Sequence, residues 1–550
     1  MTINSLHDLV DFPVDPIVQL SQDAPVVANL LPEVSVIAAM IQEYFPEFQV
    51  PAKNGSPDPV LIAENDGEGG ATNQDERKNL GPGEPTPLSL VPVKLTTLHP
   101  GNPNWSPLSM ATTSPVAPAP VMSAPVVPAS VVPAPHLRTD GFEVTLVRRD
   151  FPILAEKVNG KNLIWLDNAA TTHKPQSVID RISYFYAHEN SNVHRGAHTL
   201  AARSTDAYEG ARKKVAQFLN ASSPQEIVFV RGTTEGINLV AHSWGRYHLQ
   251  KDDEIVITWL EHHANMVPWQ ILCRETGANL RVVPVDETGQ VRLDEYARIL
   301  SPKAKLVALT HVSNALGTVT PVAEMAFMAH RHGAKVLVDG AQAVPHLKVD
   351  VQALDCDFYV FSGHKVFGPT GIGALYAKPE ILDAMHPYQS GGNMIADVTL
   401  ERSLYQPAPQ RFEAGTGNIA DAVGLGAALD YVMAIGMETI DRYEHRLLAY
   451  GMEMLRTING LRLIGTAKEK ASVLSFVIDG FTTEEIGQAL SQEGIAVRAG
   501  HHCAQPILRR FGLESTVRPS LALYNTIDEI DAMVAVLKKL TLSQRTTRWS

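Results

Sequence analysis

One lysine lies where it could bond covalently to a carbonyl compound. In the run DFYVFSGHKVFGPTGIG, Ser362, His364 and Lys365 directly follow an apolar segment that predicts a strand, and glycines on both sides allow close backbone approach. Burial and nearby positive charge lower the pKa of a lysine amine and free it to attack a carbonyl carbon. This position therefore favours a Schiff-base lysine.

A carboxylate and two imidazoles follow two other apolar runs. Asp339 ends the run KVLVD, where it could pair with a cationic ring nitrogen, although an aspartate at such a point is as often only a cap. His262 and His263 follow the run EIVIT, where one imidazole could cover the face of a flat ring. Paired histidines are equally metal ligands or capping residues, so these residues alone leave the chemistry open.

A turn of small residues follows a fourth apolar run. After Val230 the chain continues RGTTEG and then INLVAHSW, which places Thr233, Thr234 and free backbone N–H groups at the start of a predicted helix. Such helix starts bind phosphate, because their N–H groups and dipole favour negative charge. Threonine is also an ordinary helix cap, so the turn alone does not decide between the two.

A cysteine lies in a polar loop near the carboxyl end of the chain. The loop RAGHHCA at 498–504 places Cys503 after a glycine and two histidines, and positive charge such as that of Arg498 favours its thiolate. Cys273 and Cys356 are interpreted as ordinary buried cysteines. We expect no metal, because three adjacent His-His-Cys side chains do not easily converge on one ion and no Cys-x-x-Cys cluster exists. Three scattered cysteines make no disulfide framework, which indicates a reducing, cytoplasmic compartment.

These side chains need a common scaffold, and the apolar runs predict one. From residue 162 onward, short apolar runs alternate with amphipathic helical stretches, which is typical of a mainly parallel α/β sheet. The expected strands are 226–230, 254–258, 280–285, 305–310, 335–339 and 357–361. Ligands of such sheets bind beyond the carboxyl ends of the strands. A pyridoxal 5′-phosphate (PLP) site needs four parts: a phosphate-binding turn, an imidazole that covers the ring, a carboxylate and a lysine that forms an imine. The sequence offers all four in this order, and together they predict a PLP site.

The composition excludes several classes of protein. The chain has 550 residues, of which 45% are hydrophobic and 19% charged, and this length is sufficient for two or more domains. It contains no long uncharged apolar run and no basic-then-apolar leader, so we expect neither a membrane span nor secretion. Proteins that bind nucleic acid do so with basic, positively charged faces, whereas this chain has a net charge of -13, so we expect no nucleic-acid partner.

The first 137 residues differ in composition from the rest. They hold 14 acidic residues, 4 basic residues and 22 of the 37 prolines, which places a boundary near residue 138. Residues 106–137 carry 8 prolines and no charge, as in an extended spacer, and residues 51–83 have the composition of a disordered segment. Apolar residues of 34–45 fall on one helical face and predict a short helix. This helix either docks onto another protein or folds back onto the catalytic body.

Several motifs of the chain resemble one known family. The loop at 498–504 is similar to the active loop of the SufS-type (group II) cysteine desulfurases of PLP fold-type I. After the disordered extension that composition predicts over 1–137, this resemblance implies an N-terminal segment and large, mainly parallel-sheet domain over 138–400 and a small α+β C-terminal domain over 401–545. Further matching stretches are LDNAATTHKP, VHRGAHTL, RGTTEGINLVA, EHHANMVPWQ, THVSNALGTV, DGAQAVPH, SGHKVFGPTGIG and RFEAGTGN, spread over about residues 140–545.

The resemblance implies roles for individual residues. Lys365 would carry PLP as a Schiff base, Asp339 would pair with the pyridine nitrogen, and His262 would stack on the ring. It further implies phosphate contacts from Thr233, Thr234, Ser362 and His364, a ring-oxygen contact from Gln342, substrate-carboxylate contacts from Asn314 and Arg518, and contacts across a dimer interface from Thr416, His194 and Arg195.

The implied reaction removes sulfur from L-cysteine. Lys365 would take the Cα proton, Cys503 would attack the substrate sulfur, and His501 would shuttle a proton, which leaves a persulfide on Cys503 and releases alanine. The implied partners are a second copy of the chain and a sulfur-acceptor protein or thiol, as in iron–sulfur cluster assembly. Three alternatives remain: a selenocysteine lyase, an aminotransferase that would not need Cys503, and a scaffold protein with a relic site.

The extension departs from ordinary members of this family. Its Pro/Ala/Val-rich composition resembles the extensions that direct desulfurases as cargo into encapsulin nanocompartments. The candidate anchors are the helix at 34–45 and the apolar pieces near 88–98. Modest contacts would suffice, because many tails on one shell bind multivalently. Alternatively, the extension is only a linker or a docking arm for a sulfur-acceptor partner.

Overall fold

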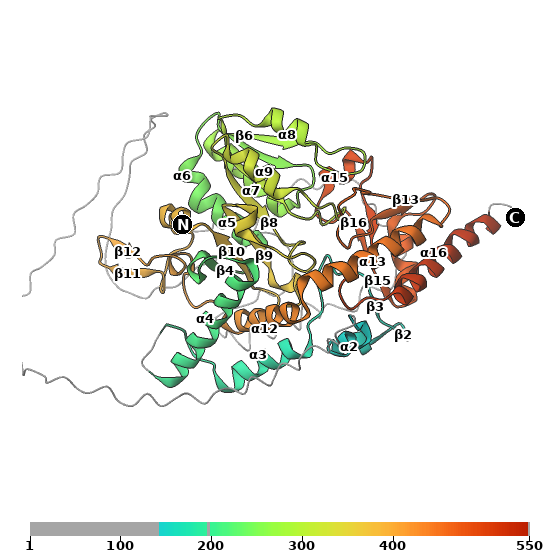
Figure 1. Cartoon of the computed structure of the whole chain (residues 1–550), viewed down its shortest axis with the longest axis horizontal. Helices are drawn as coiled ribbons and strands as arrows, with labels where there is room; N and C mark the ends of the chain where they lie inside the picture. Colours follow the sequence, from blue (N-terminus) through green and yellow to red (C-terminus); the bar gives the residue numbers. More distant parts are fainter. Residues whose placement is uncertain (1–141, 195–197, 548–550) are drawn as a thin grey trace, which may run out of the picture. The chain divides into compact units, whose positions relative to one another are not determined.

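The structure is a computed structural model that describes residues 142–194 and 198–547 (Figure 1). The extension over 1–137, its expected helix at 34–45 and the predicted site residue Arg195 lie outside the described residues.

A seven-stranded sheet forms the centre of the described chain. Its strand order is β4-β10-β9-β8-β7-β5-β6, and every neighbouring pair is parallel except those of β10, which runs antiparallel to both β4 and β9. This order confirms the mainly parallel sheet expected from the sequence. The strands are β4 (Ile227–Val230), β5 (Glu254–Thr258), β6 (Asn279–Val283), β7 (Ala304–Thr310), β8 (Lys335–Asp339), β9 (Phe358–Ser362) and β10 (Gly373–Ala377).

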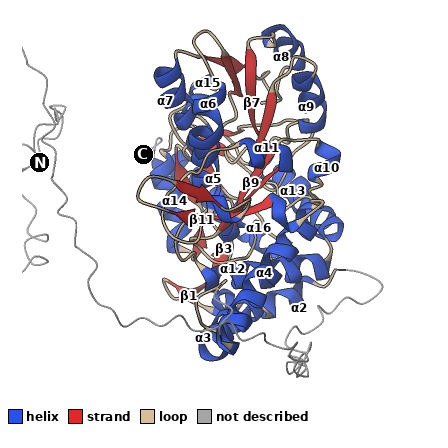
Figure 2. Cartoon of the chain, turned by 90° about the vertical axis from the view of Figure 1, so that its left-hand side faces the viewer, coloured by secondary structure: helices blue, strands red, loops and turns tan. Residues whose placement is uncertain are grey.

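Both faces of this sheet are buried, which explains why its strands are continuous apolar runs. Val307 and Leu309 of β7 join one hydrophobic cluster, with helices α4, α9 and α12, while Leu306 and Ala308 join another, with α5 and α7. Figure 2 shows α7 and α9 on opposite sides of β7. These helices are α4 (Thr199–Leu219), α5 (Thr233–Val240), α7 (Val267–Thr276), α9 (Val322–His330) and α12 (Ile419–Ile435).

A second, antiparallel sheet follows in the sequence. It contains β13 (Leu461–Leu463), β14 (Phe476–Ile478), β17 (Thr516–Arg518) and β16 (Arg498–Gly500), in that order. Helices α13 (Met437–Arg456), α14 (Thr483–Gln492) and α16 (Ile527–Thr547) pack against it around a separate hydrophobic cluster. A parallel pair, β15 (Ile495–Ala496) with β3 (Ile164–Trp165), ties this part to the segment that precedes the large sheet.

The remaining elements are short or peripheral. Helix α3 (Gln176–His188) packs with α4 on α12, as Figure 1 shows. The short strands are β1 (Lys157–Val158), β2 (Lys161–Asn162), β11 (Ile395–Val398) and β12 (Ser403–Tyr405). The short helices are α2 (Val144–Arg149), η3 (Pro152–Ala155), η4 (Pro224–Glu226), η5 (Ala241–Gly245), α6 (Arg246–His248), η6 (His263–Asn265), α8 (Leu293–Ile299), α10 (Val351–Leu354), η7 (Gly363–Lys365), α11 (Pro379–Ala384), η8 (Gln410–Phe412) and α15 (Gln505–Arg510).

Within the described ranges, no single helix is long and apolar enough to cross a membrane, although α12 and α13, bent by 75° at their junction, meet that requirement when taken as a pair.

Candidate active site

Residues predicted from several strand ends meet in one cavity. Successive parallel strands end at the same edge of the large sheet, and this edge is where ligands of such sheets bind. The cavity also receives residues from β17 and from the loop that follows β16. The predicted residues that line it are Thr233, Thr234, His262, Asn314, Asp339, Gln342, Ser362, His364, Lys365, Cys503 and Arg518.

Lys365 lies in the short turn η7 directly after β9. Loss of solvent around its amine lowers the pKa of Lys365 to about 8, while the nearby carboxylate of Asp339 acts in the opposite direction. Near neutral pH, a much larger share of this amine is therefore unprotonated than in an ordinary lysine, and this share can act as a nucleophile or a base.

The segment before α3 holds the turn that carries Lys365. Thr172 donates its hydroxyl to the carbonyl oxygen of His364 at 3.2 Å and accepts the N–H of Phe367 at 2.8 Å, so one hydroxyl spans the turn. The Thr172 N–H also reaches the His364 carbonyl at 3.0 Å, and Lys174 donates to it at 3.3 Å. These contacts fix the backbone on both sides of Lys365.

Asp339 ends β8, and His262 follows β5, which β7 separates from β8 in the sheet. Asp339 is 4% exposed and accepts the N–H of Ala341 at 3.0 Å. Burial raises the pKa of Asp339, and Lys365 counteracts that rise. The His262 Nδ1 accepts the N–H of Ala264 at 3.0 Å, which leaves the ring proton on Nε2. Burial, followed by Lys365, lowers the pKa of His262 to about 3, so this ring is a neutral, flat surface at any physiological pH.

Small hydroxyl residues surround the start of α5. The Thr233 N–H donates to the Ser362 hydroxyl oxygen at 2.9 Å, and the hydroxyl groups of the two residues share a second hydrogen bond, also at 2.9 Å. A Cβ at Gly232 would lie only 3.0 Å from this oxygen, so glycine is what allows the backbone to come this close. Backbone N–H groups at a helix start and clustered hydroxyls are suited to an anionic oxygen group.

The loop that carries Cys503 is held from two sides. His502 and Cys503 both have positive φ angles, 55° and 53°, which cost free energy for residues with a side chain. The Asn314 amide donates to the His502 carbonyl at 2.7 Å, and the His263 N–H donates to the Cys503 carbonyl at 2.8 Å. The His501 Nδ1 accepts the Cys503 N–H at 3.0 Å. These bonds offset the cost of the conformation and keep the thiol at the cavity.

Arg518 is fixed on β17 beside the same cavity. It is 3% exposed, donates to the Asn314 carbonyl at 3.0 Å and forms an ion pair with Asp167 at 3.1 Å. Arg498, opposite Arg518 in the β16–β17 pairing, lies 3.6 Å from the same carboxylate. Asp167 thus holds two guanidinium groups at the wall of the cavity.

Three buried polar atoms at the cavity have no hydrogen-bond partner within the described part of the chain. They are Asn314 Oδ1, His502 Nδ1 and Arg518 Nε. Buried polar groups are normally paired, and an unpaired one is costly. Asn314 Oδ1 can only accept and Arg518 Nε can only donate, so an acceptor and a donor are both left for a ligand that has both kinds of group, such as an amino acid.

Two predicted residues lie away from this cavity. Thr416 lines a separate cavity with Tyr208 and Tyr388. His194 pairs with Glu209 at 3.0 Å. Both were expected to act across a dimer interface, together with Arg195.

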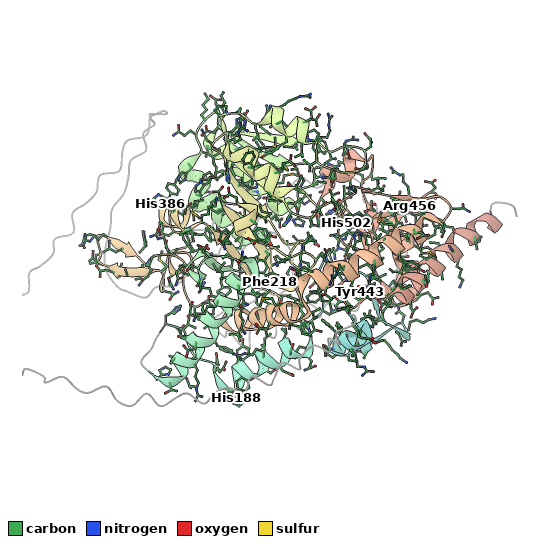
Figure 3. All side chains as sticks on the ribbon, viewed as in Figure 1. His188, Phe218, His386, Tyr443, Arg456 and His502 are labelled. Carbon is green, nitrogen blue, oxygen red and sulfur yellow. The ribbon has the colours of Figure 1, made fainter. Side chains whose placement is uncertain are left out.

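Sequence reasoning missed two residues of the site. His502, labelled in Figure 3, lines the cavity and is 7% exposed, whereas the neighbouring His501, the expected proton shuttle, is exposed. Burial lowers the pKa of His502 to about 3. Asp167, the partner of Arg518, lies within the quoted stretch LDNAATTHKP, but only its position in the fold shows its role. Among the described residues, no group of three or more His, Cys, Asp or Glu side chains is arranged to hold a metal ion.

Comparison with known proteins identifies the fold and the family. The aminotransferase class-V family matches residues 164–533. A cysteine desulfurase from Escherichia coli, solved in an S-sulfonic acid form, superposes with a TM-score of 0.68 at 39% identity, over 73% of this chain and 99% of that one. The chain belongs to the aminotransferase class-V family. A cysteine desulfurase from Cronobacter sakazakii is 52% identical over 72% of this chain and 98% of its own length, so within the class-V family the chain groups with the cysteine desulfurases.

One relative is longer than the region it shares with this chain. A cysteine desulfurase from Synechococcus elongatus is 70% identical over 400 residues, which are 73% of this chain. The same region is 64% of the Synechococcus protein.

Class-V desulfurases depend on PLP, and the cavity fits this cofactor. One cavity is lined by an amine with a lowered pKa, a buried carboxylate, a neutral imidazole and the hydroxyl-rich start of α5. Each of these groups suits one part of PLP. The Lys365 amine suits its reactive carbon and the Asp339 carboxyl group its ring nitrogen. The His262 ring suits the face of the PLP ring, and the Thr233–Ser362 contact suits its phosphate.

Proposed function

We propose that this protein removes sulfur from L-cysteine, releasing L-alanine and leaving a persulfide on Cys503. One observation carries the proposal: Lys365 and Cys503 line the same cavity, although 138 positions of sequence separate them. A transaminase needs the lysine alone. A cavity that adds a thiol is suited to a reaction in which sulfur leaves the substrate.

Substrate binding is assigned to the unpartnered atoms of the cavity wall. Arg518 and Asn314 would bind the substrate carboxylate, Arg518 through its Nε and Asn314 through its amide N–H, and Asn314 Oδ1 would in addition accept an N–H from the amino group. Asp167 keeps the Arg518 guanidinium in one orientation through its bond at 3.1 Å. These contacts would hold the amino acid in the cavity that Lys365 and Cys503 both line.

Proton transfer at Cα is assigned to Lys365. When bound, PLP supplies an electron-withdrawing ring that stabilises the negative charge left at Cα after proton removal. Lys365 would hold the cofactor until substrate binds and then take the Cα proton on its Nζ, which the lowered pKa of about 8 allows. Asp339 would keep a proton on the ring nitrogen, and Gln342 and His262 would orient the ring.

Sulfur transfer is assigned to Cys503. Its thiolate would attack the substrate sulfur, forming an S–S bond as the substrate C–S bond breaks. The electron pair of the C–S bond stays with the substrate carbon, which takes up a proton and leaves as alanine. Cysteine and one thiol thus become alanine and one persulfide, with no external oxidant or reductant.

The first experiment measures alanine and sulfide together from L-cysteine and a reductant. We expect equal amounts of both from the full-length protein, and loss of sulfide release with retained cofactor absorption in Cys503→Ser. In Lys365→Ala we expect the imine absorbance to disappear, and an unchanged spectrum would contradict its assignment. Formation of 3-mercaptopyruvate without alanine or sulfide would indicate transamination, because that reaction leaves the C–S bond intact. Turnover of selenocysteine alone would indicate a selenocysteine lyase.

Several finer proposals rest on resemblance rather than on this cavity. We propose a SufS-type (group II) enzyme that acts as a homodimer, with Thr416, His194 and Arg195 reaching the partner's site, and that passes sulfur to an acceptor protein or thiol for iron–sulfur cluster assembly. We further propose a cytoplasmic location and binding of residues 1–137 to an encapsulin shell. Co-expression with and without residues 1–137 tests the last point, because only the full chain should copurify with a shell.

A further inference from the structure

Glu261 is a wholly buried carboxylate that the proposed reaction does not use. It follows β5, is 0% exposed, and forms no ion pair with a cationic side chain of the described residues. An unpaired buried charge is costly and needs a reason. Burial raises the pKa of Glu261 to about 8, hydrogen bonds from Thr258, Asn265 and Thr310 oppose that rise, and Asp339 adds to it.

Three donors from three different elements converge on this carboxylate. Thr258 at the end of β5 donates to Oε1 at 2.7 Å, and the Thr310 N–H at the end of β7 donates to the same oxygen at 3.1 Å. Asn265 of η6 donates to Oε2 at 2.6 Å and accepts the indole N–H of Trp269 at 2.9 Å. Glu261 therefore ties two strand ends to the turn η6.

Donor and acceptor roles along this network are fixed from both ends. The Trp269 indole N–H and the Thr310 backbone N–H can only donate. Asn265 must therefore turn its oxygen to Trp269 and its amide hydrogens to Glu261, so that both oxygens of residue 261 have to accept. A glutamine there would place one N–H against another in either orientation of its amide.

The turn fixed in this way carries two contacts of the active site. His262 begins it and lines the cavity, with its ring held by the Ala264 N–H at 3.0 Å. The His263 N–H holds the Cys503 carbonyl at 2.8 Å. One short turn thus bears both the ring-covering imidazole and a support of the thiol loop.

We propose that Glu261 is a positioning residue that sets His262 over the cofactor and keeps Cys503 in place by tying η6 to the ends of β5 and β7. The proposal rests on the function proposed above and adds a group that touches neither substrate nor cofactor. It acts through the geometry of the turn.

The test compares Glu261→Gln with a double variant that restores the pattern of donors and acceptors. In Glu261→Gln we expect kcat to fall about 10-fold to 100-fold, because displaced catalytic groups slow the chemical step. The KM for L-cysteine should change less than about threefold, because the substrate-carboxylate contacts of Arg518 are untouched. Alkylation of Cys503 by iodoacetamide should become faster, and the cofactor absorption maximum should shift.

In Glu261→Gln/Asn265→Asp the carboxyl group moves to position 265. It then accepts from both Trp269 and the new glutamine, so every donor in the network has an acceptor again. We expect kcat within about fivefold of the unmodified protein and a normal alkylation rate. A folded, cofactor-loaded double variant no better than Glu261→Gln would overturn the proposal.

Glu444→Gln is the matched control, because Glu444 is 1% exposed but bonds His346 and Ser472, which do not line the cavity. The same changes in kcat and alkylation in this control would show a general loss of stability and refute the proposal. If Glu261→Gln does not fold, Thr258→Val removes one of the three donors to Glu261, together with the acceptor of the Leu260 N–H. It should change kcat and alkylation in the same directions; no change in either would contradict the proposal. Alkylation and absorption need no turnover, so they test Glu261 even if L-cysteine is not the substrate.

Discussion

At the scale of single residues, burial sets the charge of the groups in the cavity. The same loss of solvent that lowers the pKa of Lys365 to about 8 also lowers that of His262 to about 3. It raises the pKa of Asp339, which is 4% exposed. The amine therefore titrates near neutral pH, while the imidazole remains an uncharged surface.

The lowered pKa of Lys365 predicts how cofactor loading depends on pH. Bond formation between an amine and an aldehyde needs the unprotonated amine, and the unprotonated share grows as pH rises through the pKa. We expect the rate at which cofactor-depleted protein takes up PLP to rise with pH and to level off above about 8, as the change in visible absorption would show. A rate still rising steeply near the pKa of an ordinary lysine would contradict this, and Nα-acetyl-lysine is the control.

At the scale of elements, the turn η7 depends on a segment nearly 200 positions away in the chain. Thr172 and Lys174 bond the carbonyl oxygen just before Lys365. Thr172 also accepts the N–H of Phe367, whose positive φ of 62° is unusual for a residue with a side chain. The turn is short and poor in hydrogen bonds of its own, so these external bonds determine where the Lys365 amine points.

Removing the Thr172 hydroxyl tests this dependence. Thr172→Val leaves the buried Phe367 N–H without its acceptor, so we expect a loss of about 1–3 kcal/mol in the free energy of unfolding and weaker retention of PLP. Thr172→Ser keeps the hydroxyl and should restore most of both. Urea unfolding and dialysis against buffer without PLP measure the two effects. Equal behaviour of the valine and serine variants would contradict a role for the hydroxyl.

At the scale of the whole molecule, the cavity is built from two sheets. Lys365 and Asp339 come from the large, mainly parallel sheet, while Arg518 comes from the small antiparallel one. Asn314 joins them, because its amide holds the Cys503 loop and its carbonyl accepts from Arg518. Every residue that lines the cavity lies between positions 169 and 518.

This location predicts the effect of removing the extension. We expect a chain lacking residues 1–137 to fold, to bind PLP and to turn over L-cysteine within about twofold of the full chain, since terminal segments are tolerated when the removed backbone does not support the core. Circular dichroism, PLP content and alanine release measure the three properties. An aggregated product without cofactor would contradict this expectation.

Local pattern was sufficient for the central strands and for the residues at their ends. The runs EIVIT and KVLVD match β5 and β8 residue for residue, because strands buried on both faces are continuous apolar runs. β10 (Gly373–Ala377) was not predicted, since it is led by glycine and runs against its neighbours. Strands of three residues, such as β16 and β17, are too short for any periodicity to reveal them.

The sequence by itself determined the chemistry available at each strand end: an amine at Lys365, a carboxylate at Asp339 and an imidazole at His262. It did so because parallel strands end at one edge and expose the next residues there. Only the tertiary structure decided which residues from distant parts of the chain lie beside these groups and hold the rest of the site in place. Asp167 meets Arg518 across 351 positions, and Asn314 meets His502 across 188. Such pairings follow from the packing of whole elements, which no local pattern encodes.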